Sequence, residues 1–282
     1  GRDNWLFLRD ELRPYERASE NQAARIAMLA KIAKFLNQQS VQLLVVLVPD
    51  KARIAEAQLP IQRLPDHTAQ RYQEALQDMQ ALGLWTLDLR QALRASAGVT
   101  YYRSDTHWNT QGAGLAANAV AAAVKARGVS LPSTPFVTVL IDQMVEREGD
   151  LIRLMGMAGL SQAWRPPSDK EQGSETRPLK PSAARAGGLL DQVDGPPVVL
   201  IGTSYSLRGN FAGQLQQALS TEVLNVAKDG GGFLQSAAEY FNDESFQSSK
   251  PQLVVWELPE RMLPAPLTQD DRWLSLIERC CQ

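Results

Sequence analysis

Apolar side chains recur with the spacing of a helix in residues 19–37, where one stripe contains Ile26, Leu29, Ile32, Ala33 and Leu36. The next apolar run, residues 43–48, is unbroken and stops at Pro49, which is typical of a strand buried on both faces. The same alternation continues, with helices predicted in residues 68–82, 112–125, 207–219 and 233–241 and strands in residues 84–87, 198–201, 223–227 and 253–257. Alternating strands and helices predict an α/β domain of three layers, with a central, mainly parallel sheet covered on both faces.

Residues 161–197 break this pattern. They are rich in proline, glycine, serine and charged side chains, with paired prolines near both ends. Such a composition is typical of a surface loop or of a linker between domains. Because the predicted strands on both sides contribute to one sheet, we interpret the segment as a long surface loop and residues 1–282 as a single domain.

The composition is that of an ordinary globular protein. Of the 282 residues, 44% are hydrophobic and 21% are charged, and the net charge of -2 gives no general attraction to nucleic acid or anionic membranes. No apolar run approaches the ~20 residues that span a bilayer. The two cysteines, Cys280 and Cys281, are adjacent near the end of the chain, and no CxxC or His-x-His spacing occurs. We therefore predict no metal, no cofactor and no nucleic-acid partner.

Two short motifs together supply an acid, a base and a nucleophile. Residues 105–109 read Asp-Thr-His-Trp-Asn, and residues 202–206 read Gly-Thr-Ser-Tyr-Ser directly after a predicted strand. A serine hydroxyl is a weak nucleophile near neutral pH, so a base must take its proton and a third group must orient that base. Ser204, His107 and Asp105 are candidates for these roles, and the N–H of Ser204 is a candidate donor to an oxyanion.

Each of these residues also has an ordinary structural interpretation. Ser204 or Ser206 could cap the following helix, Asp105 could be a turn residue, and His107 could be a structural imidazole. The chain has only two histidines, and we assign the other, His67, to a proline-containing surface segment. Serine catalysis therefore leaves His107 as the base, and the catalytic interpretation is favoured because the two motifs occur together.

The motifs resemble those of the periplasmic alginate O-acetyltransferases within the SGNH-hydrolase-like superfamily. Residues 105–109 are similar to the acid–base motif of that family, and residues 202–206 to its nucleophile block, which often reads Gly-Asp-Ser-x-Ser. Thr203 replaces the aspartate of that block, and we expect no catalytic loss because the chemistry belongs to Ser204. Residues 1–8 and 256–261 also resemble family segments, so the resemblance covers nearly the whole chain. The acid and base precede the nucleophile, as in the polysaccharide acetyltransferases and unlike ordinary SGNH esterases.

The resemblance implies transfer of acetyl groups to hydroxyls of an exported polysaccharide, with alginate (polymannuronate) as the expected acceptor. It also implies a periplasmic location and an inner-membrane tether in an N-terminal segment that this sequence does not contain. The implied partners are a membrane-embedded acyltransferase that supplies acetyl groups and other proteins of polysaccharide acetylation and export. Some family members carry a C-terminal carbohydrate-binding module, which we expect to be absent because only about 20 residues follow Arg261.

The resemblance further suggests a second oxyanion donor. SGNH-like folds often take this donor from a glycine, and Gly231 and Gly232 lie in a glycine-rich loop between a predicted strand and a predicted helix. The alternative is that these glycines only form a flexible turn.

Charged residues near the motifs are candidates for substrate binding. A polyuronate has a carboxylate on every sugar, so Lys51, Arg103 and Arg208 could bind it from one rim, with Arg208 on the same helix face as Ser204. The alternative is that all three are solvated surface charges. Glu257 and Arg261 could form an ion pair or face the site, and the sequence leaves both open.

The predicted reaction has two steps. His107, oriented by Asp105, deprotonates Ser204 as it attacks an acetyl donor, and acetyl-Ser204 then passes its acetyl group to a sugar hydroxyl. Two alternatives stay open. In a carbohydrate acetylesterase, water would accept the acetyl group, and in a scaffold of the polysaccharide export complex no acyl chemistry would occur.

Overall fold

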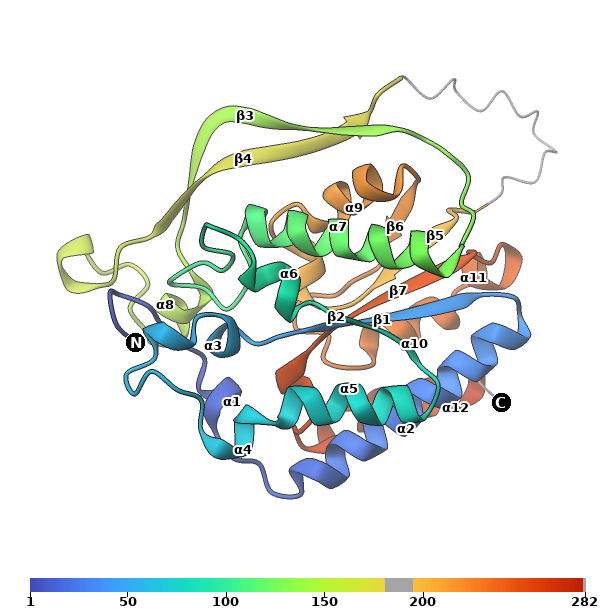
Figure 1. Ribbon diagram of the computed structural model, residues 1–282, viewed down its shortest axis with the longest axis horizontal. Helices are drawn as coiled ribbons and strands as arrows, with labels where there is room; N and C mark the ends of the chain where they lie inside the picture. The colour runs from blue at the N-terminus through green and yellow to red at the C-terminus, as the bar shows by residue number, and fades with distance from the viewer. Residues whose placement is uncertain (181–194, 281–282) are drawn as a thin grey trace.

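A five-stranded parallel sheet forms the centre of the molecule (Figure 1). The computed structural model describes residues 1–180 and 195–280. The strands lie in the order β2-β1-β7-β5-β6, and all neighbours run parallel. Their bounds are β1 Gln42–Val48, β2 Trp85–Asp88, β5 Val198–Ile201, β6 Val223–Asn225 and β7 Leu253–Pro259. The predicted α/β fold with a central, mainly parallel sheet is confirmed.

Helices cover both faces of the sheet and so make three layers. One face carries α2 (Ala18–Gln38), α5 (Arg71–Ala81), α10 (Gln235–Phe241) and α12 (Asp271–Cys280), and the other carries α7 (Thr110–Arg127) and α9 (Phe211–Leu219) (Figure 1). Along β1, Val45 and Leu47 enter the first core, whereas Leu44 and Val46 enter the second. From Leu43 to Val48 the strand is apolar because neither of its faces meets water.

Shorter helices connect these elements. The α-helices among them are α1 Arg9–Leu12, α3 Lys51–Ile54, α4 Asp66–Ala69, α6 Arg90–Arg94, α8 Asp150–Leu154 and α11 Glu244–Ser248. The 3-10 helices are η1 Glu56–Gln58, η2 Gln162–Trp164, η3 Ser204–Leu207, η4 Glu260–Met262 and η5 Leu267–Gln269. In the described part of the chain, no helix has both the length and the apolar character needed to cross a bilayer.

The first and last residues of α7 follow from its sequence. The side-chain oxygen of Asn109 accepts a hydrogen bond from the N–H of Gly112 at 2.9 Å, which caps the helix. Gly128 ends it with a left-handed φ of 75°. Because Asn109 closes the acid–base motif, its cap joins that motif directly to a rigid helix.

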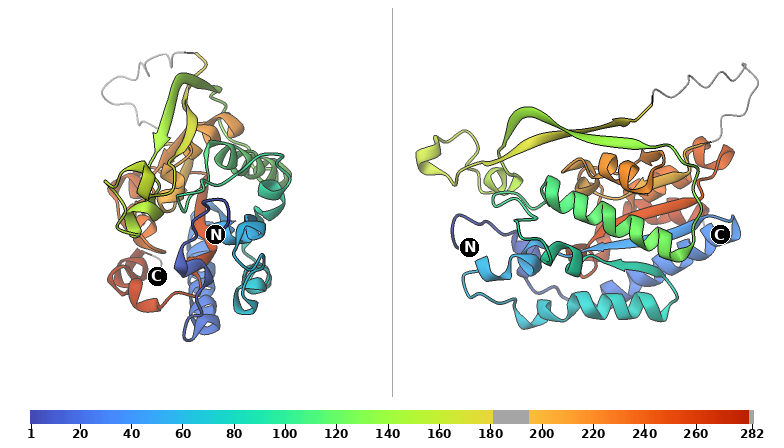
Figure 2. Two further views of the ribbon diagram at one scale, coloured as in Figure 1. Left: turned by 90° about the vertical axis from the view of Figure 1, so that its left-hand side faces the viewer. Right: turned by 45° about the horizontal axis from the view of Figure 1, so that its top comes forward.

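A two-stranded antiparallel hairpin lies outside the central sheet. β3 (Phe136–Arg147) pairs with β4 (Asp169–Pro178), and the hairpin packs on the side of the molecule that carries α7 and α9 (Figure 2). The prediction that residues 161–197 form one long loop is therefore wrong for β4. The sequence of β4 is almost entirely polar, so hydrophobic periodicity does not reveal a strand that is held by backbone pairing. Residues 181–194 of the predicted loop lie outside the described residues.

The continuous helix predicted for residues 207–219 is also wrong. The chain forms η3, and then Gly209 and Asn210 adopt left-handed φ angles of 61° and 53° before α9 begins. A Cβ on Gly209 would lie 2.9 Å from the carbonyl oxygen of Asn109. The break therefore lets the chain pass close to the start of α7.

Gly209→Ala should lower the free energy of unfolding by more than Gly128→Ala. Both glycines have positive φ, of 61° and 75°, so an alanine costs each about 1–2 kcal/mol of backbone strain. A Cβ on Gly128 meets no atom within 4 Å, whereas one on Gly209 meets the Asn109 carbonyl. Urea unfolding followed by circular dichroism compares the two variants, and equal losses would show that the close approach to α7 does not matter.

Candidate active site

Ser204 lies in a tight turn at the carboxyl end of β5, and a buried carboxylate fixes that turn. Glu257, on the neighbouring strand β7, accepts hydrogen bonds from the N–H of Thr203 at 2.8 Å and from the Ser206 hydroxyl at 3.0 Å. Burial raises the pKa of Glu257, and these hydrogen bonds act against that rise. A Cβ on Gly202 would lie 2.6 Å from Glu257 Oε2, so the turn needs glycine for lack of space.

The structure brings the predicted acid, base and nucleophile together. His107 Nε2 lies 2.7 Å from Ser204 Oγ, and His107 Nδ1 lies 2.5 Å from Asp105 Oδ1. Asp105 Oδ1 also accepts the N–H of His107 at 3.0 Å. Burial alone would raise the pKa of Asp105, but the hydrogen bonds from His107, the charge of that imidazole and the N–H of Asp150 together outweigh burial and hold the pKa well below its usual range. Asp105 therefore stays ionised, orients the imidazole and can stabilise its positive form.

His67, the other histidine, is exposed, and its Nε2 lies 2.8 Å from the carbonyl oxygen of Leu12. The assignment of this histidine to the surface is confirmed.

A second carboxylate, Asp150, lies beside the acid–base pair. Its oxygens accept hydrogen bonds from the N–H of Thr106 at 2.8 Å and the Thr106 hydroxyl at 2.5 Å. Its own N–H donates to Asp105 Oδ2 at 3.0 Å, and its Oδ2 lies 3.7 Å from His107 Nδ1. Asp150 therefore fixes both the backbone of the motif and the free oxygen of Asp105. No sequence signal marks it, because it lies 45 residues beyond Asp105.

The ligand atoms of Asp105, His107 and Asp150 lie within 4.8 Å of one another, which is close enough for a metal ion. However, N–H and O–H groups of Thr106, His107 and Asp150 point at these same carboxylate oxygens. Donors directed at an oxygen compete with a cation for its lone pairs, so the cluster fits a hydrogen-bonded acid–base pair better than a metal centre.

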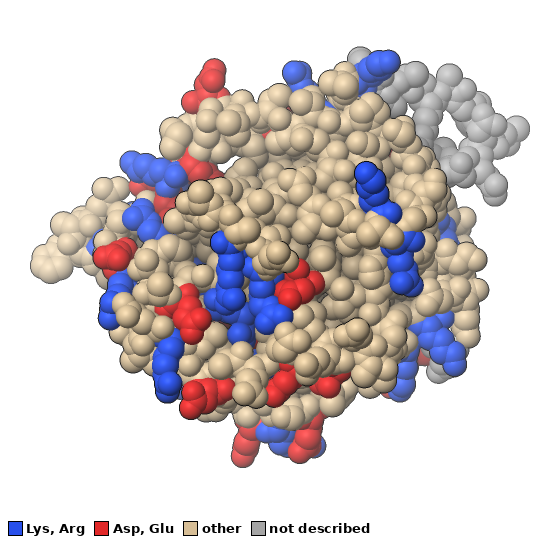
Figure 3. Space-filling view, viewed as in Figure 1, with Lys and Arg blue, Asp and Glu red and all other residues tan. Residues whose placement is uncertain are grey.

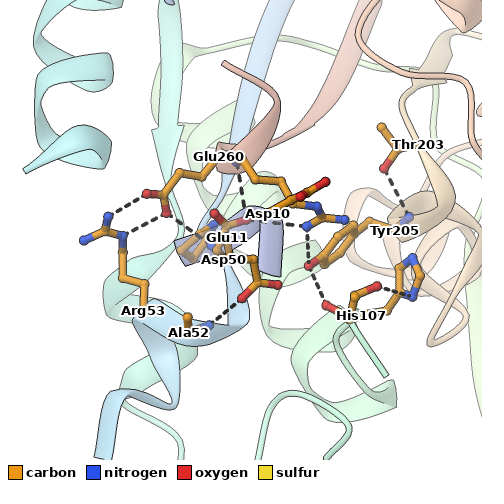
Figure 4. A network of polar contacts seen from close by, with 12 residues as sticks. Asp10, Glu11, Asp50, Ala52, Arg53, His107, Thr203, Tyr205 and Glu260 are labelled. Carbon is orange, nitrogen blue, oxygen red and sulfur yellow. Dashed lines mark hydrogen bonds and ion pairs between the residues drawn. The ribbon is translucent and has the colours of Figure 1, made fainter. Parts of the chain in front are cut away.

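Tyr205, which belongs to the nucleophile motif, contacts the acid–base motif through its ring, its hydroxyl and its carbonyl oxygen. Its hydroxyl donates to the carbonyl oxygen of Thr106 at 2.7 Å and accepts from Arg261 Nη1 at 3.2 Å. Its ring centroid lies 4.8 Å from that of His107, and its carbonyl oxygen accepts from Trp108 Nε1 at 3.1 Å. Figure 4 shows Tyr205 between His107 and the polar network around Glu260. The base therefore rests on a fully buried aromatic ring whose polar end is also satisfied.

This arrangement answers the question about Glu257 and Arg261 that the sequence left open. Glu257 holds the turn of the nucleophile, whereas Arg261 binds Tyr205 and lies 3.4 Å from Asp50 Oδ1. Among the described residues, Glu257 and Arg261 do not form an ion pair with each other. Both residues therefore hold backbone or side chains of the site in place rather than facing a substrate.

Lys51 does not lie on the predicted substrate-binding rim. Its side chain is fully buried, and Nζ donates to the carbonyl oxygens of Tyr102 at 3.0 Å, Arg103 at 2.9 Å and Asp105 at 2.7 Å. An ammonium with all three donors committed to backbone oxygens cannot bind a sugar carboxylate. Its place in the structure instead fixes the loop that precedes His107.

Arg103 and Arg208 are partly exposed and each faces a carboxylate of the protein. Arg103 Nε lies 3.5 Å from Asp169 Oδ1, and Arg208 Nη2 lies 3.0 Å from Asp229 Oδ2. The prediction that Arg208 and Ser204 share a helix face is wrong, because the chain leaves helical geometry after Leu207. A role for Arg103 and Arg208 in substrate binding stays a prediction, and it would require exchange of these partners.

The glycine-rich loop gives a mixed result for the second oxyanion donor. The N–H of Gly231 donates to the carbonyl oxygen of Lys228 at 3.2 Å, so the prediction that it is a free donor is wrong. The role of Gly232 stays a prediction. Within the described residues, the N–H of Ser204 donates to no acceptor, which leaves it available to an oxyanion.

The chain is similar to known proteins along most of its length. Residues 1–260 match the protein family described as "SGNH hydrolase-like domain, acetyltransferase AlgX". The chain is 34% identical to the "Probable alginate O-acetylase AlgJ" of Azotobacter vinelandii over 270 residues, which cover 94% of this chain and 69% of that relative.

The chain is also similar to solved structures. The O-acetyltransferase domain of Pseudomonas putida AlgJ is similar with a TM-score of 0.84 and 31% identity, covering 99% of this chain and 97% of that one. Pseudomonas aeruginosa AlgX matches with a TM-score of 0.72 over 90% of this chain and 61% of that one. At 23% identity, this second likeness supports the fold alone.

Asp150→Ala should slow acylation of Ser204 by roughly 10²-fold, because a small displacement of the base is enough for such a loss. The rate of acyl-enzyme formation with an activated acetyl ester measures the effect. Thr106→Val removes the hydroxyl that donates to Asp150 and lies 3.3 Å from His107 Nδ1, but it keeps Asp150 and the N–H of residue 106, so it should cost less. An unchanged rate in Asp150→Ala, beside a large loss in Asp105→Ala, would show that Asp150 does not position the base.

Lys51→Met should remove a pH dependence of stability. Burial lowers the pKa of Lys51 to about 8, and the surrounding carboxylates act against this, whereas the usual value is 10.5. Between these values the unfolded chain binds more protons than the folded one, so the free energy of unfolding of the wild type rises with pH relative to Lys51→Met. Urea unfolding between about pH 8 and pH 10.5 measures the difference. A constant difference would mean that Lys51 stays charged in the folded protein.

Proposed function

The chain belongs to the family of the SGNH hydrolase-like domain of the acetyltransferase AlgX, and on this premise we propose that it acetylates alginate through an acetyl-Ser204 intermediate. The observation that carries the proposal is the continuous contact from Asp105 through His107 to Ser204. The names of its relatives, which include "Probable alginate O-acetylase AlgJ" at 34% and 31% identity, support alginate as the acceptor. The proposed acetyltransferase domain extends over the whole chain, residues 1–282.

In the first step, His107 Nε2 takes the proton of the Ser204 hydroxyl while Oγ attacks the carbonyl carbon of an acetyl donor. The tetrahedral oxyanion accepts a hydrogen bond from the N–H of Ser204. As the intermediate collapses, His107 returns the proton to the leaving group and acetyl-Ser204 remains. The ionised Asp105 stabilises the imidazolium in between.

In the second step, His107 takes a proton from a hydroxyl of the polysaccharide, and that oxygen attacks acetyl-Ser204. The collapse of this second intermediate transfers the acetyl group to the sugar and returns the proton to Ser204. If water takes the place of the sugar, the same chemistry is that of an esterase. What selects the sugar is therefore access to acetyl-Ser204, and Arg103 and Arg208 are the proposed contacts to its carboxylates.

The proposed setting is the periplasm, with an N-terminal tether to the inner membrane. A membrane-embedded acyltransferase would supply the acetyl groups, and other proteins of alginate acetylation and export would deliver the polymer. Similarity to AlgX proteins of the alginate pathway supports such a shared pathway.

Incubation with an activated acetyl ester, followed by intact-protein mass spectrometry, tests the proposal. The wild type should gain one acetyl group, and Ser204→Ala should lower the rate by roughly 10³-fold or more. Ser206→Ala is the comparison within the same turn: it keeps the contact of Ser204 with His107 but removes one donor to Glu257, so it should still form the adduct, at a smaller loss of rate than Ser204→Ala.

A mannuronate oligomer then separates the remaining possibilities. Label that moves from acetyl-Ser204 to the oligomer supports the transferase. Release of acetate alone would indicate an acetylesterase. Absence of an adduct in a folded protein would contradict the proposal and favour a non-catalytic scaffold.

A further inference from the structure

A short segment of the chain carries an unusual set of exposed apolar side chains. In residues 153–164 the exposed fractions are 69% for Leu154, 55% for Met155, 46% for Leu160 and 76% for Trp164. Trp164 is the most exposed large apolar side chain in the part of the chain that the structure describes. Several large apolar side chains exposed within one short segment point to a contact with a partner or a membrane.

The segment is a fixed protrusion. Figure 1 and the right-hand view of Figure 2 show it reaching beyond the body of the molecule, next to α8. Leu151 and Ile152 are buried and anchor its beginning, while Arg165 Nε donates to the carbonyl oxygen of Leu160 at 3.2 Å and ties its end. A Cβ on Gly156 would meet no atom within 4 Å, which shows how open the tip is.

The charges of the protrusion favour an anionic surface. Residues 151–168 contain no aspartate or glutamate, and Figure 3 shows an uncharged tip at this end of the molecule, with side chains of both charges behind it. The carboxylates at its base are engaged, with Glu148 3.5 Å from Arg165 and Glu146 3.6 Å from Lys170. Arg153 is exposed and forms no ion pair with any described carboxylate.

The protrusion lies on the same edge of the sheet as the candidate active site. It leaves α8, whose first residue, Asp150, contacts Asp105 and Thr106. The N-terminus of the chain lies at this end of the molecule as well (Figure 1). A surface that binds the protrusion would therefore face the candidate active site.

We propose that residues 153–164 dip into the surface of a lipid bilayer. A convex tip with separate apolar side chains suits the interfacial region, where Leu154, Met155 and Leu160 reach the acyl chains while the backbone between them stays hydrated. An exposed tryptophan prefers this same region. Arg153 then faces anionic headgroups. The net charge of -2 gives no general attraction to membranes, so binding depends on this local contact.

The contact has a consequence for acetyl transfer, and this consequence, unlike the contact itself, rests on the proposed function. With the protrusion in the bilayer, Ser204 lies close to the lipid surface, so an acetyl donor presented at that surface has a short path to it. The polymer would approach from the opposite, aqueous side.

Sedimentation with lipid vesicles tests the contact. The purified chain should bind vesicles of phosphatidylethanolamine and phosphatidylglycerol, and Leu154→Ser/Trp164→Ser should lower the bound fraction by about tenfold. The matched control, Ile61→Ser/Leu82→Ser, replaces side chains that are 67% and 53% exposed elsewhere and should bind like the wild type. Arg153→Glu should weaken binding only where phosphatidylglycerol is present.

Tryptophan fluorescence identifies the inserted side chain. The wild type should show a blue shift on addition of vesicles, and Trp164→Phe should still sediment with them but lose most of that shift. Failure of the wild type to bind vesicles, or equal binding by Leu154→Ser/Trp164→Ser, would overturn the proposal. If the wild type forms a dimer without lipid and Leu154→Ser/Trp164→Ser is monomeric, the membrane proposal is overturned, and the segment instead forms a contact between two copies of the chain.

Acylation of Ser204 by a soluble ester needs no membrane, and it should proceed in the wild type and in every surface variant. Loss of vesicle binding with intact acylation therefore contradicts only the membrane contact. Absence of acylation in the wild type contradicts the proposed function and leaves the vesicle result as it stands.

Discussion

Buried charges at the ends of β1 and β7 hold the loops that carry the candidate catalytic residues. A charge removed from water is costly unless polar groups surround it, so each must find partners where the strand ends leave it. Lys51 binds three carbonyl oxygens of the segment that leads to His107, Glu257 binds the turn of Ser204, and Arg261 binds Tyr205. These loops have little regular secondary structure, and the buried charges supply the hydrogen bonds that a helix or sheet would otherwise provide.

Below the candidate active site, buried carboxylates and arginines also satisfy one another, in a shared network of ion pairs. Glu260 accepts from Arg53 at 2.5 Å, and Asp50 accepts from Arg71 at 2.8 Å. Burial raises the pKa of Asp50, and the charge of Glu260 adds to the rise, whereas hydrogen bonds from Arg53 lower the pKa of Glu260 against its burial. Glu260 is thus the firmly ionised member and pairs with Arg53, whereas Arg261 lies behind Tyr205 with Asp50 as its nearest carboxylate, at 3.4 Å.

The sequence was sufficient for the features that depend on local pattern. Strands buried on both faces appear as unbroken apolar runs, as β1 and β5 do, and Asp105 lies only two residues from the His107 that it orients. Features that depend on distant pairing were missed. β4 has no apolar period, Asp150 meets Asp105 across 45 residues, and Lys51 looks like an ordinary surface lysine until its three carbonyl partners are seen. The break after Leu207 was missed although Gly209 and Asn210, residue types that readily adopt positive φ, mark it in the sequence, whereas its reason, the close approach to α7, depends on distant contacts.

The pairing of Thr203 with Glu257 explains why a threonine fits at a position where the motif usually has aspartate. Its N–H and its hydroxyl both donate to Glu257, at 2.8 Å and 3.1 Å, in a place without access to water. An aspartate at this position, as in the usual form of the block, would put a second carboxylate against the first. Two carboxylates at such a distance cannot both be ionised, so one would have to take up a proton. With threonine, the single buried carboxylate receives only donors, and the turn that presents Ser204 stays fixed without a change of protonation. Thr203 and Glu257 are therefore best understood as one unit, which explains how the block can lack its aspartate while Ser204 keeps its contact with His107.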